Sequence, residues 1–339
     1  MSVTIYDIAE RAGFSIATVS RVFNDNPRVS EKTRLAVIQA AEELGYQPHA
    51  SARSLARRQT ETISAIIPMI SNYFFAEVLK GLQDRMGNSP YDLLVFSAPD
   101  LEDVENLLFK ALHRGRSAGV LLFSAPLAND TVARLRKSGQ PVVLVDSFHI
   151  AFDSISTNNL AGGAMAAEFI VASGAKRPAV LAANPNSVPA RDRLEGFKKK
   201  LAEEGINLGP ESVVYSKQQV FDGFNEESGY DGMKELLLLD QPPDAVFATS
   251  DIQALGALKA LKEFGIQTPD EMQLIGFDDL SIARYVGLTT LKQPMHEIGA
   301  GAFDLLMARI ERRNTPVVHT IYAPSLIERQ TTRNFELAL

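Results

Sequence analysis

The apolar residues at the start of the chain recur with the period of an α-helix. Four of them follow the i, i+3, i+4, i+7 spacing of a single buried stripe: Ile5, Ile8, Ala9 and Ala12. Gly13 can end this first helix, and Ser15 can cap a second helix over about 15–24. Ser30 can cap a third helix, which Gly45 ends. Two short helices joined by a tight turn, with a third packed behind them, are typical of a helix-turn-helix.

After residue 60 the apolar positions form short continuous runs separated by helix-length stretches. Eight runs have the length of buried strands: TISAIIP, YDLLVFS, AGVLLFS and PVVLVD, then RPAVLAA, SVVYS, DAVFAT and MQLIGF. Helical stretches between most neighbouring runs indicate parallel sheets that are covered on both faces. Two sets of four predict an α/β fold with two Rossmann-like lobes. Such lobes bind ligands at the carboxyl ends of their strands, so the cleft between them is the expected site.

The second predicted helix has an unusual exposed face. Val19 and Val22 point toward the first helix. At about 100° per residue, four other residues share a sector of roughly 140°: Ile16, Ala17, Ser20 and Arg21. Small apolar groups can contact thymine methyls, and an arginine can bond O6 and N7 of one guanine together. This face predicts binding in a DNA major groove, and the alternative is a small three-helix bundle in which Arg21 is only solvated.

Charge is distributed unevenly along the chain. The 339 residues carry a net charge of −7, but residues 1–58 hold 8 Lys and Arg against 6 Asp and Glu, which leaves −9 on the remainder. A basic head on an acidic body favours a polyanion-binding head, because pairing with phosphates needs only local charge. The chain has no cysteine, no long apolar run and no start typical of a signal peptide. These features favour the cytoplasm and no membrane partner.

The segment HASARSLARRQT (49–60) places one large apolar side chain among arginines. Leu55 stands between Arg53 on one side and Arg57 and Arg58 on the other. A helix this short rarely forms alone in water. An arginine-rich segment that folds on DNA and inserts a leucine wedge into the minor groove would use all of these residues. The alternative is a flexible basic linker.

Motifs along nearly the whole chain resemble one protein family. They are ATVSRV and LGYQP in the head, ARSLA in the next segment, and ISNYFFAEVLKGLQ, RDRLEGF, ATSDIQALGALKAL, LIGFDD and LTTLKQP in the body. In this order and spacing they resemble the LacI/GalR family of bacterial transcription regulators. The resemblance implies a helix-turn-helix DNA-binding domain at 1–46, a hinge helix or linker at 47–59, and an effector-binding and dimerisation domain at 60–339. The body would have the fold of type I periplasmic binding proteins.

In that fold the chain crosses between the lobes three times, which we place near 157–159, 288–290 and 322–324. The first lobe would then comprise about 60–157 and 290–322, and the second about 158–288 and 324–339. The resemblance also implies a set of DNA contacts in the head and hinge: Thr4, Ser15, Ile16, Ala17, Thr18, Ser20, Arg21, Asn24, Arg53, Ser54, Leu55 and Arg57. Relatives with this hinge favour a CpG step, which implies a dimer on a near-palindromic operator centred on CG.

Candidate effector contacts lie mainly where the predicted strands end: Phe74, Asp146, Ser187, Arg193, Phe224, Ser250 and Asp278. Carboxylates and an arginine can bond hydroxyl or amide groups, and an aromatic face can stack on a ring. In related repressors the positions matching five of these touch the effector: Phe74, Asp146, Arg193, Phe224 and Asp278. Structural alternatives are that Asp278 braces a loop and that Arg193 pairs with a carboxylate. Phe75 is favoured as a core residue over a ligand contact.

Catalysis finds little support in the sequence. SGAK (173–176) fits a Ser-x-x-Lys pattern but reads as a helix end running into a strand, and there is no Walker motif, G-x-S-x-G elbow or G-x-G-x-x-G loop. Five histidines are scattered without metal-ligand spacing: His49, His113, His149, His296 and His319. We therefore expect no enzymatic activity, no cofactor and no metal. A stand-alone sugar-binding protein is the alternative, and it would leave the head unexplained.

Two further expectations concern the class of effector and the oligomeric state. Family effectors include sugars, sugar phosphates and purines, and we expect a sugar or a sugar derivative. The chain has no tryptophan, so any stacking wall must be Phe or Tyr. Its end, RNFELAL, is too short for a coiled coil of several heptads, which predicts a homodimer rather than a tetramer.

Overall fold

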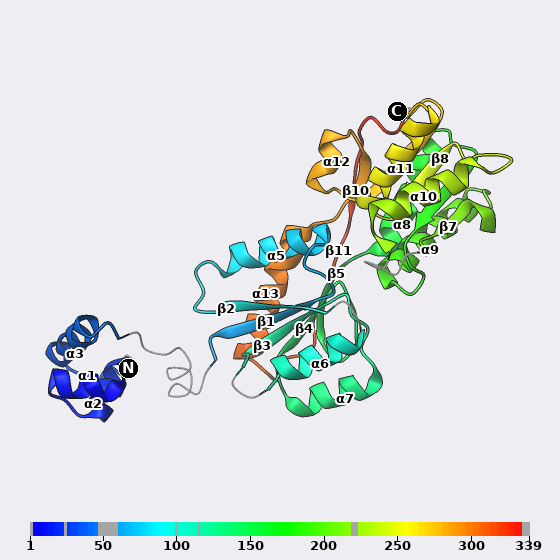
Figure 1. Cartoon of the computed structure of the whole chain (residues 1–339). Coiled ribbons are helices and arrows are strands. Elements are labelled where there is room, and N and C mark those ends of the chain that lie inside the picture. The colour runs from blue at the N-terminus through cyan, green and yellow to red at the C-terminus, as the bar shows by residue number, and fades with distance from the viewer. Residues whose placement is uncertain are drawn as a thin grey trace, which may run out of the picture.

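The head contains three helices around one small core. The computed structural model describes residues 3–23, 26–46, 60–98, 101–113, 116–217 and 223–333. The helices of the head are α1 (Ile5–Ala12), α2 (Ile16–Phe23) and α3 (Glu31–Glu43) (Figure 1). Ile8 on α1, Val19 and Val22 on α2, and Val37 on α3 are buried against one another. The predicted helix-turn-helix is therefore confirmed as a fold.

Local sequence explains where these helices begin and end. Asp7 accepts hydrogen bonds from the backbone N and Oγ1 of Thr4, which satisfies the start of α1. Gly13 ends α1 with a φ of 71°, a conformation that costs glycine little. Ser15 and Ser30 each accept a hydrogen bond from the backbone N–H three residues on, at 3.2 and 3.3 Å. The roles of Gly13, Ser15 and Ser30 were expected from the sequence.

The first lobe of the body is a six-stranded sheet with helices on both faces. Its strand order is β11-β5-β4-β3-β1-β2, and all of its strand pairs are parallel. The strands are β1 (Thr62–Ile67), β2 (Asp92–Ser97), β3 (Gly119–Phe123), β4 (Val142–Val145), β5 (Asp153–Thr157) and β11 (His319–Tyr322). The helices are α5 (Tyr73–Met86), α6 (Leu101–Ala111), α7 (Asn129–Ser138) and α13 (Met295–Glu311). Successive residues of β1 alternate between a core under α5 and α13 and a core under α6 and α7, which explains why its apolar run is continuous.

The second lobe repeats this plan. Its strand order is β12-β10-β9-β8-β6-β7, and only the edge pair β10–β12 is antiparallel. The strands are β6 (Pro178–Ala182), β7 (Val213–Tyr215), β8 (Ala245–Ala248), β9 (Gln273–Asp278), β10 (Thr289–Lys292) and β12 (Ser325–Ile327). The helices are α8 (Asn159–Ala172), α9 (Val188–Glu203), α10 (Glu226–Leu237), α11 (Asp251–Phe264) and the short α12 (Ser281–Tyr285), with a 3₁₀ turn at Pro210–Ser212. Helices α8 and α9 pack on one face of the sheet, and α10 and α11 on the other.

The described residues contain all eight predicted strands and four more that were not predicted. The missed strands are β5, β10, β11 and β12, which are short and mostly polar or exposed. They lie where the chain passes between the two sheets (Figure 1). Among the described residues, no helix is both long enough and apolar enough to span a bilayer.

One of the three crossings differs from its predicted position. Strand β5 belongs to the first sheet and α8 packs on the second, while β11 belongs to the first sheet and β12 to the second. Strand β10 pairs with β9 in the second sheet, so the middle crossing lies after Lys292 and not at 288–290. The polar TTLK run was mistaken for a connection because it has no apolar face of its own. Residues 290–292 therefore belong to the second lobe.

Candidate functional site

Arg193 is a buried cation in the second lobe. Its side chain is only 5% exposed, and the guanidinium lies 3.7 Å from the centre of the Phe277 ring. Its Nε donates to Oδ1 of Asn159 at 2.8 Å, and its Nη1 donates to the backbone oxygen of Thr249 at 2.6 Å. Nη2 donates no hydrogen bond to any described residue, so the guanidinium keeps hydrogen-bonding capacity for a ligand.

Close packing of two helices sets the position of Arg193. Gly163 on α8 faces the carbonyl of Arg193 on α9, and a Cβ there would collide with it. Gly196 on α9 meets the carbonyl of Leu160 in the same way. The two glycines let the helix backbones approach closely, which brings Asn159 at the start of α8 within reach of the guanidinium.

Two carboxylates from different lobes face this cation. Asp278 ends β9, with an Oδ1 that is 3.6 Å from Nη1 of Arg193 and that accepts a 2.6 Å hydrogen bond from Nε2 of Gln293. Asp146 follows β4 of the first lobe, and its Oδ2 accepts a 2.8 Å hydrogen bond from Oγ of Ser124. The charges of Asp146 and Arg193 also interact across the lobe boundary. The site therefore contains groups from both lobes.

The backbone is strained where these carboxylates stand. Among the described residues, four that are not glycine have positive φ: Ser124 at 46°, Asp146 at 52°, Asp278 at 125° and Asp279 at 57°. Asp278 is the last residue of β9 and the other three directly follow a strand, so all four lie at the carboxyl edge of a sheet. Such conformations are costly for residues other than glycine and are concentrated at functional sites. The four residues lie on both sides of the lobe boundary, at the carboxyl edges of the two sheets.

Burial shifts the acid–base behaviour of all three charged groups. It raises the pKa of the Asp146 carboxyl to about 6, against the opposing effects of the Ser124 hydrogen bond and the Arg193 charge. It raises the pKa of Asp278 to about 6 as well, although Arg193 and the Gln293 hydrogen bond oppose the shift. Burial also lowers the pKa of the Arg193 guanidinium, while Asp278 and Asp146 act in the other direction.

Two predicted contacts are aromatic side chains, and one of them, Phe224, lies near Arg193. The Phe224 ring centre lies 5.8 Å from the guanidinium carbon, and Phe224 is half-buried. Phe74 is half-buried at the start of α5 and packs edge-on against Phe75, with ring centres 5.4 Å apart. Phe75 is buried in the core of the first lobe beside Phe123, which confirms that it is a core residue.

The two predicted serine contacts have different surroundings. Ser187 precedes α9 and is buried, but its side chain forms no capping hydrogen bond there. Ser250 is the N-cap of α11, where Oγ accepts from the backbone N of Gln253 and donates to its Oε1 at 3.3 Å. Its hydroxyl is thus used by the helix start, and we leave Ser250 out of the proposed contacts. Asp251 beside it is likewise structural, because it accepts hydrogen bonds from Leu280 N and Thr290 Oγ1.

Three residues that position the site were not identified from the sequence: Asn159, Thr249 and Gln293. Asn159 and Gln293 stand next to chain crossings, and Oε1 of Gln293 is buried without a partner among the described residues. The polar TNN and KQP stretches at the crossings were the only available signal. Within the described residues no group of three or more His, Asp or Glu side chains is arranged to hold a metal ion.

The head presents a separate candidate surface on α2. Ile16, Ala17 and Arg21 are exposed, whereas Val19 and Val22 are buried behind them. Thr4 and Ser15 are exposed near helix starts, and Thr18 and Ser20 are half-buried. This arrangement matches the sector expected from helical periodicity. The other predicted DNA contacts lie outside the described residues: Asn24, Arg53, Ser54, Leu55 and Arg57.

The fold and the two surfaces define a DNA-binding regulator with a ligand-binding body, and comparison with known proteins agrees. Residues 4–49 match the family model of bacterial regulatory proteins, lacI family, and residues 167–332 match a periplasmic binding protein-like domain. The chain is 32% identical to catabolite control protein A of Priestia megaterium, over 98% of this chain and all of the relative. It is also 32% identical to the HTH-type transcriptional regulator GalR of Escherichia coli K12, over 97% of this chain and 95% of that protein.

Solved structures give the same assignment. The lac repressor dimer bound to operator and the anti-inducer ONPF is similar to this chain with a TM-score of 0.86 and 27% identity, covering 98% of this chain and all of the other. The chain belongs to the LacI/GalR family of bacterial transcription regulators. It is a DNA-binding transcription regulator of the repressor type with a small-molecule effector domain.

The raised carboxyl pKa values predict an unusual dependence of stability on pH. A carboxyl whose pKa is higher in the folded state stabilises the fold below its unfolded pKa, and this contribution is lost as pH rises through the folded value. For Asp146 and Asp278 that window extends from about pH 4 to just above 6. Asp146→Asn should therefore flatten the fall in melting temperature between about pH 4 and about pH 6.5, by the equivalent of about 1–3 kcal/mol.

Thermal unfolding of the ligand-free protein at several pH values measures this effect. Asp130→Asn at the exposed start of α7 is the matched control and should leave the slope unchanged. Equal slopes for wild type and Asp146→Asn would show that the Asp146 carboxyl is not buried in solution.

Proposed function

We propose that this protein is a repressor whose DNA affinity is set by a sugar or sugar derivative bound around Arg193. The observation that supports this most directly is the buried guanidinium, whose Nη2 donates to no described residue and which is flanked by carboxylates from both lobes. Carboxylates accept hydrogen bonds from hydroxyls and arginine donates to oxygen, so the set suits a polyhydroxylated ligand. Phe224 and Phe74 offer apolar faces for its ring.

Named relatives support a ligand of this class. A structure described as a CelR–cellobiose complex is similar to this chain with a TM-score of 0.72 and 27% identity, over 97% of this chain and 99% of the other. Of the predicted contacts we retain six: Phe74, Asp146, Ser187, Arg193, Phe224 and Asp278. A ligand that bonds both Asp146 in the first lobe and Asp278 in the second would favour one arrangement of the lobes over another, which is how binding could be coupled to DNA affinity.

The head would read DNA through the exposed face of α2. Ile16 and Ala17 are small apolar groups for thymine methyls, and Arg21 is the fork-shaped donor for a guanine. We retain the sequence-based proposal of a domain boundary near 46–47, a hinge at 47–59 and a leucine wedge from Leu55 at a central CG step. These proposals rest on sequence, because the hinge lies outside the described residues. A cytoplasmic location follows from the proposed role.

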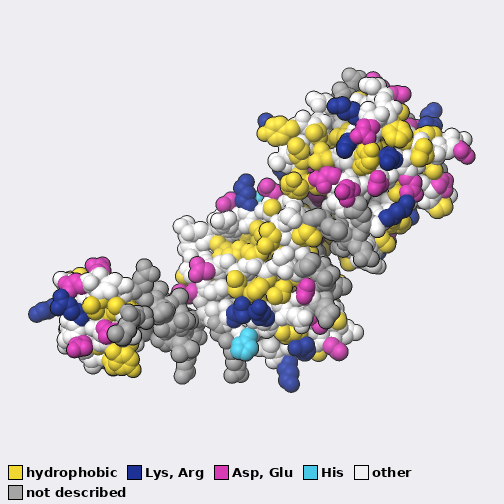
Figure 2. All heavy atoms as spheres, in the orientation of Figure 1, with side chains coloured by type: hydrophobic (Ala, Val, Ile, Leu, Met, Phe, Trp, Pro, Cys, Tyr) yellow, Lys and Arg dark blue, Asp and Glu magenta, His cyan; other side chains and the backbone are white. Residues whose placement is uncertain are grey.

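A homodimer is supported by an exposed apolar surface on and after α12. Ile282, Tyr285 and Val286 are 37%, 82% and 39% exposed, and Figure 2 shows apolar side chains gathered over this part of the second lobe. Apolar side chains grouped on a surface commonly mark protein interfaces. The lac repressor of similar structure is described as a dimer on its operator.

Tyr285→Ala should weaken self-association by about 10-fold or more, because a large aromatic at an interface often contributes 2 kcal/mol or more. Sedimentation equilibrium of the full chain measures the dimer dissociation constant. Ile150→Ala, which removes another side chain that is 77% exposed, should leave it unchanged. A Tyr285 variant as dimeric as wild type would place the interface elsewhere.

The proposed function is tested by two measurements on the full chain. Selection from random duplexes should return a near-palindrome, and a thermal-shift screen of sugars, sugar phosphates and nucleobases should return a stabilising ligand. A ligand at 100 times its dissociation constant stabilises by about 2.7 kcal/mol. The same ligand should alter operator affinity. Ligand binding without any preference among DNA sequences would favour a stand-alone sugar-binding protein.

A further inference from the structure

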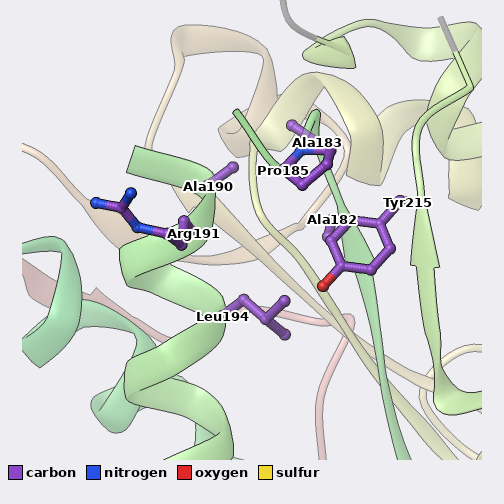
Figure 3. Close-up of a pocket in the computed structure, with 7 residues that line it drawn as sticks. All are labelled: Ala182, Ala183, Pro185, Ala190, Arg191, Leu194 and Tyr215. Atoms are coloured by element: carbon purple, nitrogen blue, oxygen red, sulfur yellow. The ribbon is translucent and has the colours of Figure 1, made fainter. Parts of the chain in front are cut away.

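A groove runs along the second lobe between α9 and the edge strand β7. Its volume is about 520 Å³, in the range of small-molecule sites. A smaller cavity adjoins it and shares three lining residues: Arg191, Leu194 and Tyr215. Figure 3 shows Leu194 on α9 and Tyr215 on β7 pointing toward one another, with Pro185 and Ala183 closing the end. The two spaces therefore form one continuous depression.

The wall from α9 is one complete helical face. Six of its residues line the groove with the spacing i, i+3, i+4, i+7, i+8, i+11: Arg191, Leu194, Glu195, Lys198, Lys199 and Ala202. The opposite wall is mainly apolar and comes from Ile206, Leu208 and Tyr215. This groove is distinct from the Arg193 site, because Arg193 points to Asn159 and Phe277 on another side of the same helix.

The charge in the groove is opposite in sign to that of the body around it. Lys198 and Lys199 are exposed and form no ion pair with any described residue, and the only carboxylate in the lining is Glu195. The Arg191 guanidinium points away from Tyr215 in Figure 3, and its Nη2 lies 3.3 Å from Oδ1 of Asp192. The positive charge that a ligand in the groove could meet therefore comes from the two lysines. An unpaired basic pair in a body of net −9 favours an anion.

We propose that this groove is a second ligand site, for an organic anion with an apolar body. The anionic group would lie on Lys198 and Lys199, and the apolar part would cover Leu194, Ile206, Leu208 and Tyr215. A phosphate or a carboxylate head satisfies the same chemistry. This site is additional to the effector site proposed above.

The absence of tryptophan from the chain gives a direct probe. Tyr215→Trp keeps an aromatic wall and places one fluorophore in the groove. The full-length variant is titrated with hexyl phosphate and with heptanoate, which separate a phosphate head from a carboxylate head. 1-Hexanol and inorganic phosphate supply the apolar and anionic parts alone. We expect a saturable fluorescence change with at least one of the two amphipathic anions, at a lower concentration than with either part alone.

Variants in the Tyr215→Trp background locate the bound anion. Lys198→Gln with Lys199→Gln should weaken binding about 10-fold or more, which is about 1.4 kcal/mol. Lys259 on α11 is another exposed lysine, and Lys259→Gln should change the dissociation constant of the anion by less than about 2-fold. Asp278→Asn should leave the affinity for the anion unchanged, whether or not a sugar effector is found.

Three results would overturn the proposal. One is no saturation by either anion up to about 10 mM. Another is equal affinity for 1-hexanol and hexyl phosphate, or equal affinity with and without the two lysines. The third is loss of binding in Asp278→Asn but not in the lysine variant, which would place the anion in the effector site.

Discussion

Replacing Arg193 with alanine is expected to lower the free energy of unfolding of the body by about 3–5 kcal/mol and to abolish the effector response. Removing one partner of a buried ion pair leaves the other charge without compensation, which gives a cost of this size. Here Asp278 lies 3.6 Å from the guanidinium, and the oxygens of Asn159 and Thr249 lose their donor. The stacking partner Phe277 would also face an empty volume. Urea unfolding of the ligand-free protein measures the stability change.

Asp278→Asn separates recognition from stability. An asparagine keeps an oxygen for the hydrogen bond from Gln293 Nε2 and removes only the charge. It should therefore lose less stability than Arg193→Ala, because Asp146 still acts on the guanidinium and the hydrogen bonds of Arg193 to Asn159 and Thr249 remain. It should bind operator normally and bind the effector more weakly by calorimetry. Arg191→Ala, two residues from Arg193 but exposed on the same helix, is the control and should keep both stability and effector affinity. If Asp278→Asn binds the effector as tightly as wild type, the pocket has been placed wrongly.

Arg21→Ala is expected to weaken operator binding by about 1–3 kcal/mol, roughly 5- to 150-fold, and to remove the preference at one base position of each half-site. The reason is geometric, because an exposed arginine on α2 can present two donors to O6 and N7 of a single guanine. No described residue pairs with its side chain, so the guanidinium remains available. Competition binding with every single-base variant of the operator measures both effects.

A matched arginine distinguishes base reading from general attraction to DNA. Arg11 on α1 forms an ion pair with Glu43 on α3. Arg11→Ala should therefore reduce operator affinity only slightly and leave the preference among bases unchanged. Arg21→Lys should retain part of the affinity but lose the bidentate contact and hence the preference. A uniform loss on all sequences for Arg21→Ala would make it a phosphate contact. The identity of the base reader would then have to be sought at Ile16, Ala17 or Ser20.

The head could be predicted almost completely from the sequence because its structure is locally determined. Ser15, Ser30 and Gly13 set helix ends through contacts within three or four residues, and these contacts are the same in any surroundings. The exposed face of α2 follows from its period once Val19 and Val22 are buried. Eight strands could likewise be predicted, because each contains a short run of mostly apolar residues, as expected in parallel sheets with helices on both faces.

What only the tertiary structure decided depends on partners that are distant in the sequence. Strands β5, β10, β11 and β12 carry too few apolar residues to be recognised, and they exist because a neighbouring strand provides their hydrogen bonds. Ser250, Asp251 and Asp278 all stand at the ends of apolar runs. The neighbouring sequence does not show which of them caps a helix, which holds a loop in place and which contacts a ligand.

The arginine shows the same limit. Arg193 reaches Asn159 and Thr249, 34 and 56 residues away, through the close approach of α8 and α9 at Gly163 and Gly196. Because the Arg193 guanidinium is buried, it needs these hydrogen-bond partners. Burial also raises the pKa of Asp146, which belongs to the opposite lobe. Both effects require the packed chain to exclude water from the charged groups. Sequence therefore determined which charged residues could form the site, and packing decided which of them remain available to a ligand.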